Sequence, residues 1–322
     1  MNGVAARHWA DLGESTFVAG MRLLAWVHRR FGRAPFRLLM LPVLAWMLLV
    51  RPSARRASRQ YLDRLQAAHG ALGHAPRAGD VLRHFAAFGE TLLDKALAAS
   101  GRYPFDRVRI DGALPTPEQG RGGVIVTAHV GCLELCQALA ERQPGLELKV
   151  LVHTRHAQRF NAWLQRLHPA QRIELLQVTE FDPAVAERLG SFVERGGWVA
   201  IVGDRVPVQA SKTVQHRFLG HPAPWPIGAY VLAALWRCPL VFMACVRAGD
   251  HHRLLLRCLS LRVELPRRGR EAALAAYVAS YVAQIESLLV EAPYEWFNFF
   301  DFWAQPAAGA APGRLQHDQP PP

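Results

Sequence analysis

The sequence is poor in lysine, in acidic residues and in cysteine. Only three of its 38 basic residues are lysines, and the 26 acidic residues leave a formal net charge of +12. The cysteines are odd in number and scattered through apolar segments: Cys132, Cys136, Cys238, Cys245 and Cys258. This pattern excludes a disulfide framework and favours buried free thiols in a reducing compartment.

Several catalytic motifs are also missing. The chain has no Gly-x-Ser-x-Gly elbow, no P-loop and no Gly-x-Gly-x-x-Gly turn. These absences disfavour a serine hydrolase, an NTPase and a dinucleotide-dependent enzyme. His129 with Cys132 and Cys136 matches no standard zinc spacing, and no fourth ligand is evident, so we expect no metal.

Positive charge is concentrated near the N-terminus. Residues 1–60 hold ten Arg against Asp11 and Glu14, which accounts for +8 of the total of +12. These Arg clusters bracket an apolar stretch rich in Leu and Trp. The pattern is typical of an anchor on a membrane surface with anionic lipids, and it disfavours a nucleic-acid-binding arm, for which no module is recognisable.

Phe36–Val50 is the most apolar stretch of the chain. It is uncharged for 13 residues from Leu38, fewer than the ~20 needed to cross a bilayer. We expect a membrane-embedded or interfacial helix here, with a buried core helix as the alternative. The sequence leaves open whether this helix spans the membrane.

Beyond the helical N-terminal third, strands and helices alternate, which predicts a sheet covered by helices. We expect three parts: N-terminal membrane-associating helices over 1–60, an α/β domain over 61–303 and a disordered tail over 304–322. The elements expected after residue 100 are strands over 108–110, 124–127, 148–153, 173–177 and 198–202, helices over 132–142, 157–167, 183–194, 227–235 and 271–291, and a hairpin over 240–261.

The chain is organised around the stretch Val124–Cys136. A β-branched run ends at His129, turns at Gly131 and is expected to become a helix that carries Glu134. A His that removes a proton from a hydroxyl needs an acceptor on its other ring nitrogen, and a nearby Glu can serve. A single His is more often structural, but the carboxyl ends of strands are where α/β proteins bind ligands.

Other polar residues are expected at strand ends too. Asp204 and Arg205 follow the strand over 198–202 and could face the same pocket as His129, with a local ion pair as the alternative. Arg155 follows the strand over 148–153, and Asn161 lies in the next helix. The Gly- and Pro-rich segment 218–228 is expected to be a loop, as in the wall of an acyl-chain tunnel.

An aromatic cluster lies near the C-terminal end. Residues 293–303 read Pro-Tyr-Glu-Trp-Phe-Asn-Phe-Phe-Asp-Phe-Trp. Such a cluster can pack under a core or lie at a membrane interface, and core packing is the favoured interpretation.

Together these segments resemble the bacterial lipid A late-acyltransferase family, within the lysophospholipid acyltransferase superfamily. The resemblance rests on Thr127-Ala-His129-Val-Gly-Cys-Leu-Glu134, the family's His-x4-Asp/Glu motif, on Gly203-Asp-Arg205, on Phe218-Leu-Gly220 with Pro222-Ala223, and on Trp296-Phe-Asn-Phe-Phe. It runs from Trp9 to Trp303. The sequence of segments Gly203–Pro207 and Glu295–Trp303 most resembles a sub-branch of this family that is found with aryl-polyene or xanthomonadin-type pigment genes.

The resemblance implies an α/β/α sandwich with an N-terminal membrane anchor, on the cytoplasmic face of the bacterial inner membrane. It implies an acyl-carrier-protein thioester as donor, a lipid acceptor and no metal or organic cofactor. His129 would be the general base and Glu134 would orient it, with no covalent acyl-enzyme. Backbone amides near Gly131, Arg155 or Arg205 would stabilise the oxyanion. Val130 and Cys132 replace the family's more usual aromatic, Leu or Asn neighbours, so we expect the acceptor pocket to differ.

Two functions remain open on the sequence. The first is a membrane-associated O-acyltransferase whose acceptor is a lipid A-type saccharide, another lipid or the anchor of a pigment. The second is a non-catalytic protein that binds acyl chains on a lipid or pigment assembly line. The intact His129–Glu134 pair favours the first.

Overall fold

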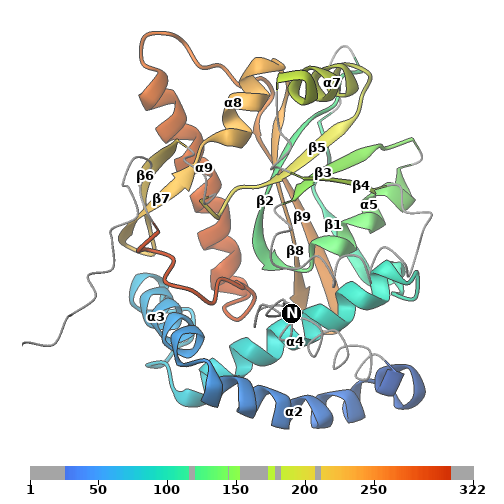
Figure 1. Cartoon of the computed structure of the whole chain (residues 1–322), viewed down its shortest axis with the longest axis vertical. Coiled ribbons are helices and arrows are strands. Elements are labelled where there is room, and N and C mark those ends of the chain that lie inside the picture. The colour runs from blue at the N-terminus through green and yellow to red at the C-terminus, as the bar shows by residue number, and fades with distance from the viewer. Residues whose placement is uncertain are drawn as a thin grey trace, which may run out of the picture.

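The structure is a computed structural model, and it describes residues 26–115, 120–143, 145–152, 173–177, 183–206 and 212–305. Its centre is a mixed α/β unit with a seven-stranded, mostly parallel sheet (Figure 1). The strand order is β1-β9-β8-β2-β5-β3-β4. This confirms the predicted α/β class.

The strands follow the apolar, β-branched runs of the sequence. Their bounds are β1 Val108–Asp111, β2 Gly123–Gly131, β3 Leu148–Val152, β4 Ile173–Gln177, β5 Trp198–Val202, β8 Leu240–Ala248 and β9 His251–Ser260. Strands β2, β3, β4, β5 and β8 are parallel, and β9 runs antiparallel to β8 as the predicted hairpin. Central β2 is buried along most of its length, as a strand covered on both faces must be.

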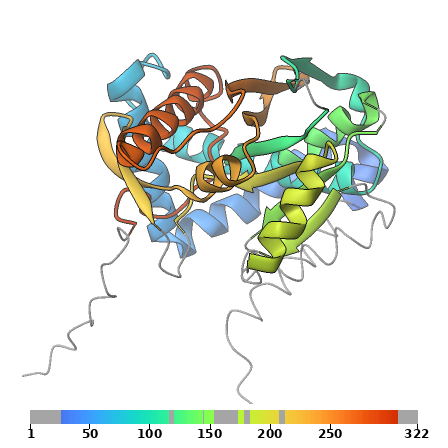
Figure 2. The same ribbon diagram turned by 90° about the horizontal axis from the view of Figure 1, so that it is seen from above.

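Side chains alternate between two cores on the two faces of the sheet. Val124 and Val126 of β2 face one core, which also takes buried residues of α7 (Pro183–Glu194), α8 (Gly228–Leu235) and α9 (Arg270–Glu291). Ile125 faces the other core, together with the 3-10 turn η2 (Leu133–Cys136) and α5 (Gln137–Arg142). The unit therefore has helix, sheet and helix layers, and Figure 2 shows α9 at one end of it.

Three α-helices lie between residues 33 and 99, ahead of the sheet: α2 Arg33–Val50, α3 Pro52–His69 and α4 Ala78–Ala99. Buried residues of all three join the core that includes α9. The boundary predicted at residue 60 falls inside α3. Helices α2 and α9 are both long and apolar enough to cross a membrane, but 39% of the α9 window is buried against 17% of the α2 window. The buried residues of α9 mark it as a core helix.

Two elements differ from their predictions. Residues 218–228 are not a loop: β6 (Thr213–Phe218) and β7 (His221–Pro226) form a two-stranded antiparallel sheet. The helix predicted over 132–142 begins instead with the 3-10 turn η2, and α5 follows only from Gln137. The helix predicted over 157–167 and the tail over 306–322 lie outside the described residues.

The cysteines and the aromatic segment mostly follow their predictions. All five cysteines are free, four of them are buried, and Cys258 is exposed. Trp296 and Phe302 of the aromatic segment are fully buried and pack against each other with ring centroids 4.8 Å apart. Core packing is therefore confirmed for these two rings.

Candidate functional site

Two neighbouring parallel strands bring His129 and Asp204 together. His129 lies near the carboxyl end of β2, and Asp204 follows the end of β5 by two residues. The strands pair in register from Gly123 with Trp198 to Thr127 with Val202. The backbone amide of Gly203 then donates to the carbonyl of Thr127 over 2.8 Å, which extends the pairing to the turn that carries Asp204.

The Asp204 carboxylate holds His129 at two points. The imidazole Nδ1 lies 2.7 Å from Oδ1 of Asp204, and the backbone amide of His129 donates to Oδ2 over 3.0 Å. Because a carboxylate only accepts, Nδ1 carries the proton and Nε2 has a free lone pair. Nε2 makes no hydrogen bond within the described part of the chain, and 30% of the His129 side chain is exposed. This is the arrangement of a general base.

Asn298 and Arg205 complete the support of the dyad. The Asn298 amide donates from Nδ2 to Oδ2 of Asp204 over 2.8 Å. The Arg205 guanidinium donates from Nε to Oδ1 of Asn298 over 2.7 Å and from Nη2 to the carbonyl of Phe297 over 3.1 Å. Asp204 is fully buried and accepts hydrogen bonds at both oxygens, as a buried charge requires.

The surroundings of Asp204 favour its ionised form. Burial alone would raise the pKa of its carboxyl, but the charge and hydrogen bonds of His129, with Arg205 nearby, lower that pKa to about 2. Asp204 is therefore ionised at neutral pH and can stabilise an imidazolium on His129.

The end of β2 is shaped by one glycine and one tyrosine. Gly131 has a φ of 63°, and a Cβ there would lie 1.9 Å from the carbonyl oxygen of Cys245. The register between β2 and β8 shifts between Thr127 and Gly131, which marks an irregularity where the site lies. The Tyr281 hydroxyl, from α9, donates to the carbonyl of Thr127 over 2.7 Å.

The predicted partner of His129 lies elsewhere. Glu134 pairs with Lys95 of α4, with Oε1 2.5 Å from Nζ. Because β2 continues through Gly131 and η2 follows, Glu134 is carried toward α4. The hydrogen bond predicted from His129 to Glu134 is made to Asp204 instead, so the orienting role predicted for Glu134 is corrected.

The other predicted site residues have different outcomes. The amide of Gly131 donates to the carbonyl of Glu295 over 2.8 Å, so it is not a free donor for an oxyanion. Arg205 lies beside the dyad and is exposed. Arg155 and Asn161 lie outside the described residues, and their substrate-binding roles stay predictions.

Sequence reasoning did not single out Asn298, Lys95 or Tyr281 as site residues. Asn298 carried the best signal, since it is the polar residue inside the aromatic segment Trp296–Phe300 and has a buried side chain. No signal marked Lys95 or Tyr281, because each lies on a helix remote in sequence from the residue it contacts, Glu134 or Thr127.

The arrangement could act as a His–Asp base at the carboxyl edge of a sheet. No group of three His, Cys, Asp or Glu within the described ranges is arranged to hold a metal ion. No family model and no curated protein matches this chain. The fold and the dyad define the class: a mixed α/β protein with a buried carboxylate and an oriented, partly exposed imidazole whose Nε2 can take up a proton.

Proposed function

We propose that this chain is a membrane-associated O-acyltransferase. It would move a fatty acyl or polyene acyl group from an acyl-carrier-protein thioester to a hydroxyl of a lipid acceptor. The observation that carries the proposal is the hydrogen bond from Nδ1 of His129 to Asp204, which leaves Nε2 as the base. The donor, the lipid acceptor, the lysophospholipid-acyltransferase-like form of the sandwich and the location on the cytoplasmic face of the bacterial inner membrane follow from the sequence resemblance.

The proposed reaction is a direct displacement. Nε2 of His129 takes the proton of the acceptor hydroxyl as its oxygen attacks the thioester carbonyl. The tetrahedral intermediate then collapses, the C–S bond breaks, and the leaving thiolate takes the proton from Nε2. The Asp204 carboxylate stabilises the imidazolium between these two steps, and no covalent acyl-enzyme forms.

Arg205 is the proposed source of positive charge for the oxyanion. It follows Asp204 directly, and Asn298 and the carbonyl of Phe297 fix its guanidinium on one side. A cation in this position suits an oxyanion or the phosphate of a carrier's phosphopantetheine. Arg155 stays a second candidate for the same role.

The experiment is lipid mass spectrometry of a deletion strain that is complemented with the natural chain, with His129→Ala or with His221→Ala. His221 is an exposed histidine of β7 and serves as the matched control. We expect His129→Ala to lack the acylated product and His221→Ala to restore it. Full product from His129→Ala, at equal protein level, would overturn the proposal and favour the non-catalytic acyl-chain-binding alternative.

A further inference from the structure

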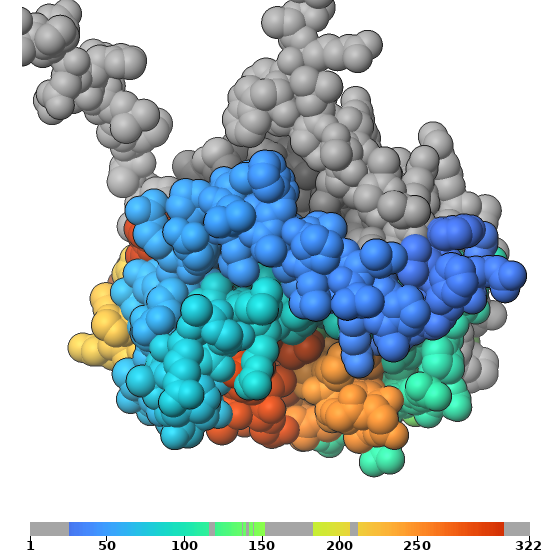
Figure 3. Space-filling view, turned by 90° about the horizontal axis from the view of Figure 1, so that it is seen from below, coloured from blue at the N-terminus to red at the C-terminus, as the bar shows by residue number. Residues whose placement is uncertain are grey.

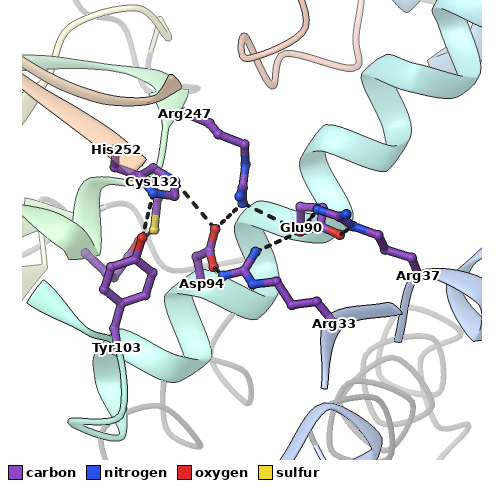
Figure 4. Close-up of polar contacts among 9 residues, drawn as sticks. Arg33, Arg37, Glu90, Asp94, Tyr103, Cys132, Arg247 and His252 are labelled. Carbon is purple, nitrogen blue, oxygen red and sulfur yellow. Dashed lines mark hydrogen bonds and ion pairs between the residues drawn. The ribbon is translucent and has the colours of Figure 1, made fainter. Parts of the chain in front are cut away.

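A cluster of charged side chains fixes α2 to the body of the protein (Figure 4). From α2, Arg33 pairs through Nη1 with Glu90 at 2.9 Å, and Arg37 pairs through Nε with Glu90 at 2.7 Å. Arg33 also pairs with Asp94, which in turn pairs with Arg247 of β8. The side chain of Asp94 is fully buried, so these pairs tie α2, α4 and the sheet together.

Apolar contacts continue the attachment along α2. Phe36, Met40 and Leu44 recur at intervals of four and are its buried residues. The Met40 sulfur fits against Gly89 of α4, where a Cβ would lie only 2.2 Å away. The ion pairs and this stripe hold α2 over more than three turns. In Figure 1, α2 and α4 lie together below the sheet.

The opposite side of α2 is apolar and exposed. Nine of the twelve large hydrophobic side chains exposed in the described part of the chain lie between residues 26 and 50. Leu38 is 68% exposed, Trp46 is 65% exposed and Leu49 is 70% exposed. Figure 3 shows α2 as a band along the outside of this face, next to α3 and α4.

The charge around this surface is of one sign. Residues 26–62 contain eight Arg and no acidic residue. Arg33 and Arg37 pair with Glu90 and Asp94, whereas Arg29, Arg30, Arg51 and Arg56 are exposed in the segments just before and just after α2. An apolar face bordered by arginines is complementary to an anionic bilayer surface. Two copies of the chain would bring like charges together if they met on this face.

We propose that α2 lies in the plane of an anionic bilayer surface on its Leu38, Trp46 and Leu49 side, and does not span the membrane. A spanning α2 would have to leave α4, which would break the ion pairs of Arg33 with Glu90 and with the buried Asp94 and would expose Phe36 to lipid. This inference rests on the membrane location in the proposed function but not on the chemistry at His129.

The orientation has a consequence for access to the site. The Lys95–Glu134 pair joins α4 to the turn that follows β2, so the carboxyl end of β2 lies over the helical layer that carries α2. The carboxyl end of β2, which carries His129, therefore points toward the bilayer surface on which α2 lies. A lipid in that surface is on the same side of the molecule as the site.

The experiment measures the depth of two positions on one side of α2. Leu38 and Leu49 are eleven residues apart, which places them on the same side and ~16 Å apart along the axis. Leu38→Cys and Leu49→Cys are each made in the full chain with Cys258→Ser, since Cys258 is the exposed native thiol. Each is labelled with a fluorophore and bound to phosphatidylglycerol–phosphatidylethanolamine vesicles that contain lipids brominated at known depths.

We expect equal depths for the two labels, and binding that weakens in phosphatidylcholine vesicles and with added salt. Leu38→Ser with Leu49→Ser should reduce binding at least tenfold. The matched control is Leu235→Ser with Leu261→Ser. Leu235 in α8 is 63% exposed and Leu261 just beyond β9 is 71% exposed, and we expect this control to leave binding unchanged. Asp204→Asn should leave the depths unchanged.

Labels at unequal depths, or labels near the bilayer centre and not at the boundary of headgroups and acyl chains, would overturn the in-plane orientation while the membrane location stands. Failure of the natural chain to bind vesicles would overturn both. The chain could instead form dimers without lipid, and the Leu38 and Leu49 substitutions could dissociate them. That result would show that a second copy of the chain, and not the bilayer, covers the apolar side of α2. In every case the product found by lipid mass spectrometry decides the acyltransferase proposal separately.

Discussion

Nδ1 of His129 lies 2.7 Å from Oδ1 of Asp204, although the two residues are 75 positions apart in the chain. The contact depends on two parallel strands that end side by side, β2 and β5. The carboxylate that orients His129, the proposed base, therefore belongs to the turn after β5. The carboxylate of the His-x4-Glu motif, Glu134, is in an ion pair with Lys95 instead. The two carboxylates therefore have separable roles.

Asp204→Asn should reduce acyl transfer far more than Glu134→Gln. Asparagine can keep a hydrogen bond to Nδ1 but supplies no charge to stabilise an imidazolium, so we expect a ~10²- to 10⁴-fold loss in kcat. Glu134→Gln removes an ion pair of two partly exposed side chains, and we expect less than a tenfold loss. Turnover of a thioester donor by the two purified variants measures the difference. A larger loss in Glu134→Gln would return the orienting role to Glu134.

The positions of His129 and Asp204 could be predicted because β-branched runs identify their strands and parallel strands share a carboxyl edge. Their contact could not be predicted, because it depends on how far β2 extends. The strand was expected to end at Thr127 but continues to Gly131, and a 3-10 turn then replaces the start of the expected helix.

The β6–β7 sheet could not be predicted from the sequence for another reason. Prolines 222, 224 and 226 lie inside β7, and proline cannot donate a backbone hydrogen bond. A segment with three prolines therefore indicates a loop when it is considered alone. Pairing with β6, in which Gln215 lies opposite Pro224, makes it a strand. The strand conformation of β7 therefore depends on its pairing with β6 and cannot be recognised from the sequence of β7 alone.

Gly131→Ala should disturb the site more than Gly220→Ala. Both glycines have positive φ, 63° and 80°, so alanine is strained at either position, by ~1–2 kcal/mol. Only at Gly131 does the new Cβ meet a backbone oxygen, 1.9 Å away, whereas nothing lies within 4 Å of it at Gly220. We expect the melting temperature to fall further for Gly131→Ala, with loss of acyl transfer. Equal melting temperatures would contradict the close approach of β2 to β8.

Acidification should destabilise the fold partly through His84. This ring is buried, with Nε2 2.7 Å from the carbonyl of Trp296 and Nδ1 2.9 Å from the Ser58 hydroxyl. Burial lowers its pKa to about 4, although the bond to Trp296 opposes this. Between about pH 6.5 and 4 the unfolded chain takes up a proton that the folded chain does not, so ~3 kcal/mol of stability is lost as the pH falls.

The measurement is unfolding by urea at pH 7 and at pH 4.5. His84→Gln should be less stable than the natural chain at pH 7 but should show a smaller loss on acidification. His221→Gln changes an exposed histidine and should keep the natural pH dependence. An unchanged pH dependence in His84→Gln would show that His84 does not cause the loss.

Asp94→Ala should destabilise the chain strongly, and Asp63→Ala should not. Both substitutions remove an aspartate that pairs with arginine, but Asp94 is fully buried among Arg33 and Arg247, whereas the Asp63 side chain is 48% exposed beside Arg59. Removal of one partner from a buried pair leaves uncompensated charge and costs about 3–5 kcal/mol, whereas an exposed pair contributes about 0–1 kcal/mol. Thermal unfolding of the two variants tests this. If Asp94→Ala were as stable as Asp63→Ala, the ion pairs would not hold α2 against α4, and the in-plane orientation of α2 would lose its main support.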